Sequence, residues 1–142
     1  GRGRFAVGRA LVERAARLVG VGSGNPVGVV RLLAWAVDAR ALNPSAPLHL
    51  VVSRAPGDAF RRGEIADEVG RTFPPSSLTF VPADRRVERA AWEGEPVAAG
   101  PFTKALAPLA AALTPSRSWT RVRRGHTRSR RRVATRADRA VA

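Results

Sequence analysis

Three short, almost wholly apolar runs divide the first 113 residues, and they constrain the fold more than any other feature of the sequence. The runs are 18–21 (Leu-Val-Gly-Val), 48–52 (Leu-His-Leu-Val-Val) and 78–81 (Leu-Thr-Phe-Val). Each is short and bounded by glycine, proline or polar residues, which is typical of a buried strand. Apolar strands that alternate with helical segments indicate a parallel sheet with helices on both faces.

The clearest helix signal follows the glycine-rich stretch after the first run. Asn25 is a favourable N-cap, because its side chain accepts from free N–H groups of the first turn, and Pro26 at the first helical position loses no hydrogen bond. Apolar residues recur at helical spacing up to Leu42, and Asn43-Pro44 ends the helix. Other helices are predicted over about 4–15, 61–71 and 102–113 (Pro108 kinking the last or marking a later start), and in a short segment between Asp84 and Gly94.

Several conspicuous side chains are assigned to packing or to an exposed surface. Trp35 and Trp92 lie among the apolar residues of predicted helices, so we expect both in the core. His49 lies between leucines in its predicted strand, without Cys, Asp or Glu nearby, so we expect a packed or edge histidine and no metal site. Glu64 and Glu68 lie one helical turn apart and are expected on an exposed face.

The regular spacing of apolar residues that predicts helices and strands ends at residue 114, and a strongly basic segment follows. Residues 114–142 hold ten arginines against one acid, Asp138, and so carry +9 of the chain's net charge of +14. Arginine alternating with Ser, Thr and Gly buries too little apolar area to fold. We therefore divide the chain into an α/β domain, 1–113, and a disordered Arg-rich tail, 114–142. Two interpretations of the tail stay open: it binds DNA by neutralising phosphates, or it is a solvated low-complexity end. The proposed contact residues are Arg121, Arg123, Arg124, Arg128, Arg130, Arg131 and Arg132.

The composition excludes several classes of protein. The chain has no cysteine, which excludes disulfides, thiolate catalysis and Cys-ligated zinc. No apolar run approaches the roughly 18 residues of a membrane span. The basic start, Gly1 to Arg4, is not followed by the apolar core of a signal peptide. We therefore expect a soluble, cytoplasmic protein without a membrane span.

Short motifs in the middle of the chain follow one another in a characteristic order. Residues 50–54 (Leu-Val-Val-Ser-Arg) precede a helix, and 80–91 and 94–97 then contain P-x-D-x-x-V-x-x-A and G-x-P-V. This order resembles the C-terminal half of ParA/MinD-type ATPases, in which the first strand commonly ends in V-V-N-R. The resemblance covers about residues 15–113. It implies a partial, parallel three-layer sheet of the P-loop NTPase type, flanked by helices.

The resemblance also implies a nucleotide site at two strand ends. In the family these two segments form the adenine pocket, which implies that Ser53, Arg54, Pro82 and Asp84 bind the cofactor. Their position agrees with the general rule that ligands of open α/β sheets bind outside the carboxyl ends of strands. Ser53 stands where the family has an Asn that hydrogen-bonds the base, and a hydroxyl cannot reproduce that two-pronged contact. ATP is therefore expected to bind weakly.

The family's phosphate loop has no counterpart in this sequence. Lys104 is the only lysine and does not lie in a glycine-rich loop, and no Walker-B-like strand ends in Asp. Without these features nothing cradles phosphates or holds Mg²⁺, so we predict no catalytic residue, no metal site and no ATP hydrolysis by this chain alone. The expected function is that of a truncated or degenerate ParA/MinD-like protein, acting as a positioning or partition factor or in secretion assembly.

Other interpretations of the sequence stay open. Gly22, Gly24 and Gly28 follow a strand and open a helix, as in an NADP-binding Rossmann fragment with Arg54 at the 2′-phosphate, although strict G-x-G-x-x-G spacing fails. A nucleic-acid-binding adaptor acting through its tail is a second alternative. Asp84 is either a site residue or only a helix cap. A three-stranded sheet leaves an exposed edge, which predicts a homodimer or a missing N-terminal half.

Overall fold

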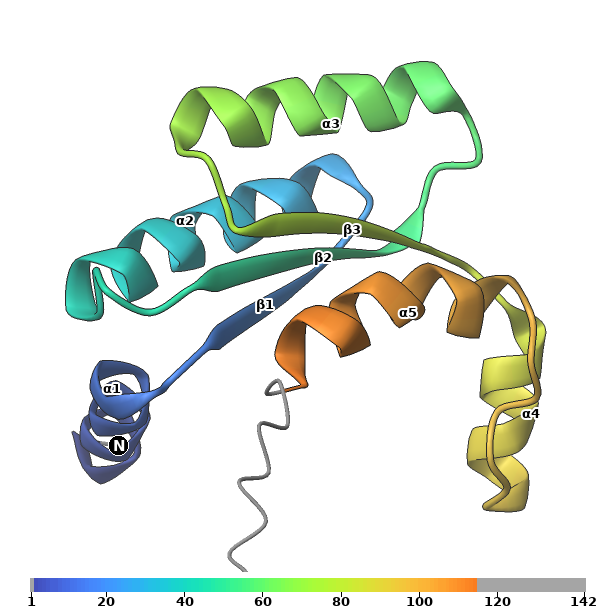
Figure 1. Ribbon diagram of the computed structural model, residues 1–142, viewed down its shortest axis with the longest axis horizontal. Coiled ribbons are helices and arrows are strands. Elements are labelled where there is room, and N and C mark those ends of the chain that lie inside the picture. The colour runs from blue at the N-terminus through green and yellow to red at the C-terminus, as the bar shows by residue number, and fades with distance from the viewer. Residues whose placement is uncertain (1, 115–142) are drawn as a thin grey trace, which may run out of the picture.

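The chain folds into alternating helices and strands, and the computed structural model describes residues 2–114 (Figure 1). In chain order the elements are α1 (Arg2–Arg14), β1 (Leu18–Ser23), α2 (Pro26–Leu42), β2 (Leu48–Ala55), α3 (Ala59–Thr72), β3 (Ser77–Pro82), α4 (Arg85–Glu93) and α5 (Pro101–Leu113). All predicted strands and helices are present. The predicted tail lies outside the described residues, apart from Thr114.

The three strands form one parallel sheet in the order β1-β2-β3. Leu48, Leu50 and Val52 of β2 pack in one cluster with residues of α2 and α3, whereas Val51 packs in a second cluster with α5. α2 and α3 lie on one face of the sheet and α5 lies on the other (Figure 1). Each strand-to-strand connection contains one helix, and two connections of the same hand place both helices on the same face. The predicted α/β class, with a parallel sheet flanked by helices, is therefore confirmed.

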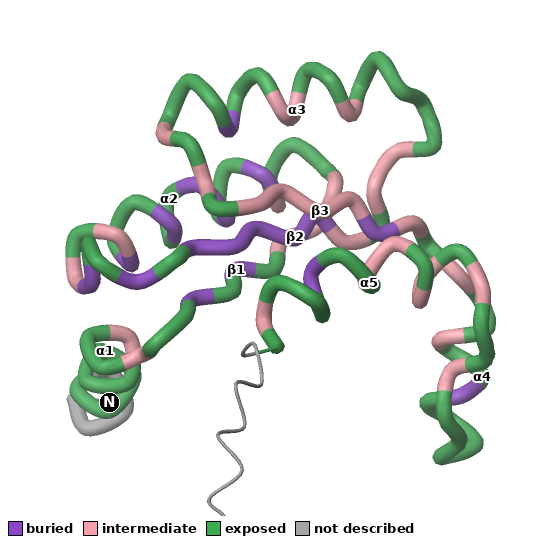
Figure 2. Tube along the Cα trace, in the orientation of Figure 1, coloured by how far each residue is buried: buried purple, intermediate pink, exposed green. Residues whose placement is uncertain are grey.

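Burial is greatest along β2 and on the side of α2 that faces the sheet (Figure 2). β2 is the central strand and is covered on both faces, which explains why its sequence is apolar without alternation. His49 is buried, and its Nδ1 lies 2.8 Å from Ser77 Oγ on the neighbouring strand, so the prediction of a packed histidine is confirmed. Glu64 and Glu68 are exposed, as predicted.

The helix boundaries follow from the capping residues that the sequence suggested. Asn25 Oδ1 accepts a hydrogen bond of 2.7 Å from Gly28 N, and Pro26 is the first residue of α2. Gly94 ends α4 in the left-handed conformation with φ of 68°. α3 begins earlier than predicted, at Ala59, because the Asp58 carboxylate accepts from the N–H of Phe60 and caps the helix there.

Asn43, the residue after α2, joins three segments of the chain. Its Nδ2 donates to the carbonyls of Val12 and Ala15 at 2.9 and 3.0 Å, which ties the end of α1 to the end of α2. Its Oδ1 accepts from Ser45 Oγ and Ala46 N in the connection to β2. Because Asn43 is buried, these bonds satisfy polar groups that water does not reach.

Two expectations drawn from apolar patterning are wrong. Trp92 is 91% exposed, because α4 projects from the end of the sheet and buries only Ala90 among its residues. Trp35 is not in the core either; its ring lies over Gly20 at the side of the sheet and is partly exposed. Of the two alternatives for Pro108, the later start is excluded, because α5 begins at Pro101 and continues past Pro108 to Leu113.

Coverage of the sheet by helices is incomplete at β1. α5 packs on β2 and β3 through a small cluster that contains Val51, Val81 and Leu109. Val19 and Val21 point to the same face as Val51, yet they are 38% and 66% exposed. No helix within residues 2–114 is long and apolar enough to cross a membrane.

Candidate functional site

The four predicted cofactor residues lie at the carboxyl ends of two neighbouring strands. Ser53 and Arg54 lie near the carboxyl end of β2. The next residue, Ala55, pairs with Pro82, the last residue of β3. Asp84 follows as the N-cap of α4. The fold therefore brings both segments to one edge of the sheet, where α2, α3 and α4 also begin (Figure 1).

Ser53 is engaged in holding the sheet together. Its Oγ donates to the carbonyl of Gly22 at 3.0 Å, and its own carbonyl accepts from Gly24 N at 2.8 Å. Both bonds tie β2 to the end of β1. The hydroxyl thus has a structural partner in place. Of the four predicted residues, Arg54 and Asp84 are those whose polar side chains keep bonding capacity.

Arg54 has an unusual backbone conformation. Its φ of 49° makes it the one non-glycine residue with positive φ between residues 2 and 114. The pairing of β2 with β3 shifts register between Ser53 and Ala55, so Arg54 is the extra residue of a bulge. Left-handed backbone costs a residue with a Cβ about 1 kcal/mol or more. Arg54 is exposed and lies at the carboxyl end of the central strand.

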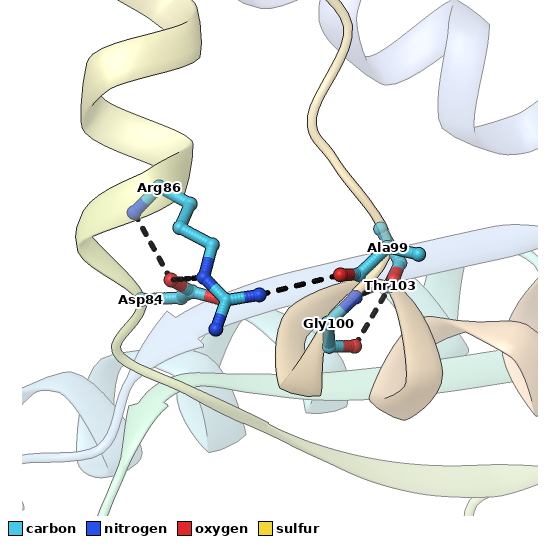
Figure 3. Close-up of polar contacts among 5 residues, drawn as sticks. All are labelled: Asp84, Arg86, Ala99, Gly100 and Thr103. Atoms are coloured by element: carbon cyan, nitrogen blue, oxygen red, sulfur yellow. Dashed lines mark hydrogen bonds and ion pairs between the residues drawn. The ribbon is translucent and has the colours of Figure 1, made fainter.

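Asp84 caps α4 with one carboxylate oxygen and leaves the other without a partner. Oδ1 accepts from Arg86 N at 3.0 Å, which confirms the cap predicted from sequence. Oδ2 is buried and has no hydrogen-bond partner among the described residues. It lies close to Gly100, the N-cap of α5, as Figure 3 shows. The positive end of the α5 dipole favours a carboxylate there.

Arg86 links the starts of α4 and α5 around this carboxylate. Its Nη1 donates to the carbonyl of Ala99 at 3.3 Å, and its Nε lies 3.8 Å from Asp84 Oδ1 (Figure 3). Thr103 completes the start of α5, because its Oγ1 accepts from Gly100 N at 2.9 Å. The sequence pointed to Asp84 but not to these partners, which lie up to nineteen positions further along the chain.

The glycine-rich loop between β1 and α2 is explained by close packing. A Cβ at Gly22 would lie 2.7 Å from Leu32 Cβ, and one at Gly24 would lie 2.8 Å from the carbonyl oxygen of Arg54. At the start of α2, Pro26 has no N–H and the Gly28 N–H is held by Asn25. Few donors are left for a pyrophosphate. The geometry therefore offers little support for the Rossmann interpretation.

Sequence reasoning missed a groove between the amino-terminal parts of α2 and α3, which Pro56 also lines. It has a volume of about 600 Å³, within the usual range for small-molecule sites. Its lining residues are Gly24, Asn25, Pro26, Val29, Val30, Pro56, Arg61, Glu64, Ile65 and Glu68. No pattern in the sequence could have indicated it, because it arises from the spacing of two helices that touch each other little. Val29, Val30 and Ile65 supply apolar lining, and Arg61, Glu64 and Glu68 supply charged groups.

The described part of the chain contains no group of three or more His, Cys, Asp or Glu side chains that could hold a metal ion. A scan against models of protein families finds no match to this chain, and a search of curated proteins finds no significant relative. The likeness to ParA/MinD-type ATPases therefore depends on the motifs around Ser53, Pro82 and Gly94 alone.

Proposed function

We propose that this chain is a degenerate ParA/MinD-like protein of the P-loop NTPase fold class that binds an adenine nucleotide weakly at the carboxyl edge of its sheet. On this proposal it does not hydrolyse the nucleotide, and it serves as a positioning, partition or secretion-assembly factor. The observation that carries the proposal is the strained backbone of Arg54, an exposed cation at the end of the central strand.

Backbone strain of this kind concentrates at sites of function, because elsewhere nothing opposes its removal. Replacement of Arg54 by glycine would relieve the strain, yet a large cationic side chain occupies the position. A guanidinium at this edge fits the charge of a nucleotide phosphate. We assign Arg54 to the phosphates in place of the absent phosphate loop.

Two neighbouring features support a nucleoside at the same edge. Asp84 Oδ2 is an acceptor without a partner, and a ligand hydroxyl or amine reaches this buried atom only if the exposed Arg86 side chain beside it moves away. The groove beside Pro56 is large enough for a purine and has apolar walls from Val29 and Ile65. Ser53 is left out of this assignment because its hydroxyl bonds to Gly22.

The test is a titration of the full-length, isotope-labelled chain with ATP, followed by amide chemical shifts. We expect shifts that are localised to Arg54, Asp84 and Gly24, with a dissociation constant in the millimolar range. Arg54→Ala should abolish the localised shifts, whereas Arg14→Ala, at an exposed position at the end of α1, should leave them unchanged.

Two further ligands separate a nucleotide site from simple charge attraction. Tripolyphosphate carries the charge without the base, and adenosine carries the base without the charge. If tripolyphosphate alone produces the same shifts near Arg54, the chain attracts anions there and has no nucleotide site. If ATP produces no localised shifts, the proposed nucleotide site is refuted. Phosphate release from ATP is expected to stay at background.

A second candidate function is nonspecific DNA binding by residues 114–142, which is favoured by their net charge of +9. Binding of this kind weakens linearly on a log–log plot against salt, with a slope of about 0.9 per phosphate neutralised. Deletion of 114–142 should abolish DNA binding, and replacement of the seven arginines between Arg121 and Arg132 by glutamine should flatten the slope. Unchanged affinity after deletion would exclude this function.

A further inference from the structure

The outer edge of β1 is not covered by any other described element. An open cavity of about 400 Å³ runs along it and is lined only by residues of β1 and α2. α1 lies beyond the amino end of the strand (Figure 1). An exposed strand edge presents unpaired backbone groups, and natural proteins usually cover or block such an edge. No proline and no charged residue occurs within Leu18–Ser23 to block it.

The backbone groups on this edge can be identified from the bonds on the other side of the strand. Leu18 N donates to Pro47 O, and Gly24 N donates to Ser53 O, so the even-numbered residues of β1 face β2. Peptide groups alternate in direction along a strand. The N–H and C=O groups of Val19, Val21 and Ser23 therefore point outward, away from β2.

The side chains around this edge suit a second strand. Val19 and Val21 expose an apolar stripe on the face that α5 leaves uncovered. On the opposite face the ring of Trp35 lies over Gly20 and is 37% exposed. A strand paired with β1 would bury both surfaces. Their position on opposite faces of one edge favours extension of the sheet over attachment of a helix to one face.

The charges next to Trp35 indicate which strand would fit. Arg31, Trp35 and Asp38 lie on one side of α2, at the spacing of successive helical turns, and Arg31 and Trp35 line the cavity at the β1 edge. α2 runs back along β1, so Arg31 lies toward the carboxyl end of the strand and Asp38 toward its amino end. A two-fold axis at Gly20 would place Arg31 of each copy opposite Asp38 of the other.

We propose that the chain forms a two-fold symmetric dimer in which β1 pairs antiparallel with β1 of a second copy. The two sheets then join into one six-stranded sheet. With the axis at Gly20, Val19 of each copy lies opposite Val21 of the other. The outward-pointing N–H and C=O groups of these two residues form hydrogen bonds, and their side chains lie on the same face of the joined sheet. The two α2 helices lie side by side on one face, with paired charges on either side of the two tryptophans. This dimer does not depend on nucleotide binding.

Sedimentation of nuclease-treated, full-length protein over a range of concentrations tests the proposal. We expect a monomer–dimer equilibrium that Val21→Lys shifts to monomer, whereas Val37→Lys, at an exposed position on another side of α2, leaves it unchanged. Thermal unfolding of each variant verifies that it is folded. A wild-type chain that stays monomeric at its highest attainable concentration would overturn the proposal.

A charge exchange tests the two-fold arrangement itself. Arg31→Asp and Asp38→Arg should each weaken dimerisation by about tenfold, because like charges then face each other across the axis. The double variant restores both pairs and should dimerise like the wild type. Asp67→Arg, on α3, serves as the matched control. Dimerisation that the double variant does not recover, or assembly beyond the dimer, would contradict antiparallel pairing of β1.

Discussion

Gly28 belongs to a glycine pattern typical of dinucleotide-binding loops, yet close packing alone requires a glycine at this position. A Cβ at this position would lie 2.7 Å from Ser23 Cβ and 2.9 Å from the Ser23 carbonyl carbon. Backbone and a short side chain cannot move away as the end of a long side chain can. The G-x-G-x-x-x-G pattern therefore reflects the tight turn that brings α2 against the end of β1, and it need not reflect a phosphate.

We predict that Gly28→Ala lowers the free energy of unfolding by about 2 kcal/mol, the usual cost of forcing atoms into a closely packed site. Gly63→Ala is the matched control, because Gly63 lies inside α3 with no atom within 4 Å of the added Cβ. The control should gain about 0.5–1 kcal/mol from higher helix propensity. Urea denaturation measures both. Equal effects of the two substitutions would show that the close contact at Ser23 is not real.

Arg54 gives the opposite case, a residue that is unfavourable for its own backbone. We predict that Arg54→Gly raises the free energy of unfolding by about 0.5–1 kcal/mol, because glycine adopts a φ of 49° without strain. Arg54→Ala keeps the strain and should not stabilise the chain. Both variants should lose the localised ATP shifts. If urea denaturation shows that Arg54→Ala stabilises the chain as much as Arg54→Gly does, the backbone at residue 54 is not strained.

Among the elements, α1 is held mainly by its last turn. Val12 and Ala15 pack against the main core cluster and give their carbonyls to Asn43, while Val7 and Leu11 stay more than half exposed. The helix has an apolar pattern but little surface to bury it against in the described chain. Its position thus depends on the Asn43 amide and on the packing of Val12 and Ala15.

We predict that Asn43→Ala destabilises the chain by about 2 kcal/mol, because the two carbonyls and the Ala46 N–H lose their partners. Asn43→Asp should be worse at neutral pH, since a carboxylate then faces two carbonyl oxygens. Burial beside these oxygens raises the pKa of the new carboxyl in the folded state. Stability of the variant is then greatest at low pH and is lost as pH rises through that pKa. Urea denaturation against pH measures this, and a pH-independent difference from Asn43→Ala would contradict it.

Across residues 2–114, burial falls from the central strand outward. β2 is buried along most of its length, whereas α4 buries one residue and α1 buries none of those whose side chains are described. The outer strand β1 is covered on one face only. Stability should therefore be distributed unevenly.

We predict that amide hydrogen exchange is slowest for Leu50 and Val52, at the level of global unfolding, and fast throughout α4. The amide of Val21 points outward from β1 and distinguishes the oligomeric states. It should exchange fast in the Val21→Lys monomer and slowly in the wild-type dimer. A wild type with fast exchange at residue 21 at every concentration would argue against strand pairing at this edge.

Much of the fold and part of the candidate site could be predicted from the sequence, because the relevant forces are local. The continuous apolar runs specify buried strands, and Asn25, Asp84 and Gly94 specify helix ends through bonds to their own neighbours. The placement of Arg54 and Asp84 at one edge followed from the rule that parallel strands end together. Trp92 was mispredicted because an apolar helix pattern does not reveal whether anything lies opposite it.

Sequence alone thus determined the order and class of the elements and the identity of the polar residues at the carboxyl edge. The tertiary structure decided which groups still have free bonding capacity. Ser53 Oγ is used by Gly22, Asp84 Oδ2 is left over near Gly100, and the edge of β1 is open beside Trp35. The physical reason is that a hydrogen bond or a packed face needs a partner in space, and these partners lie far apart in the chain.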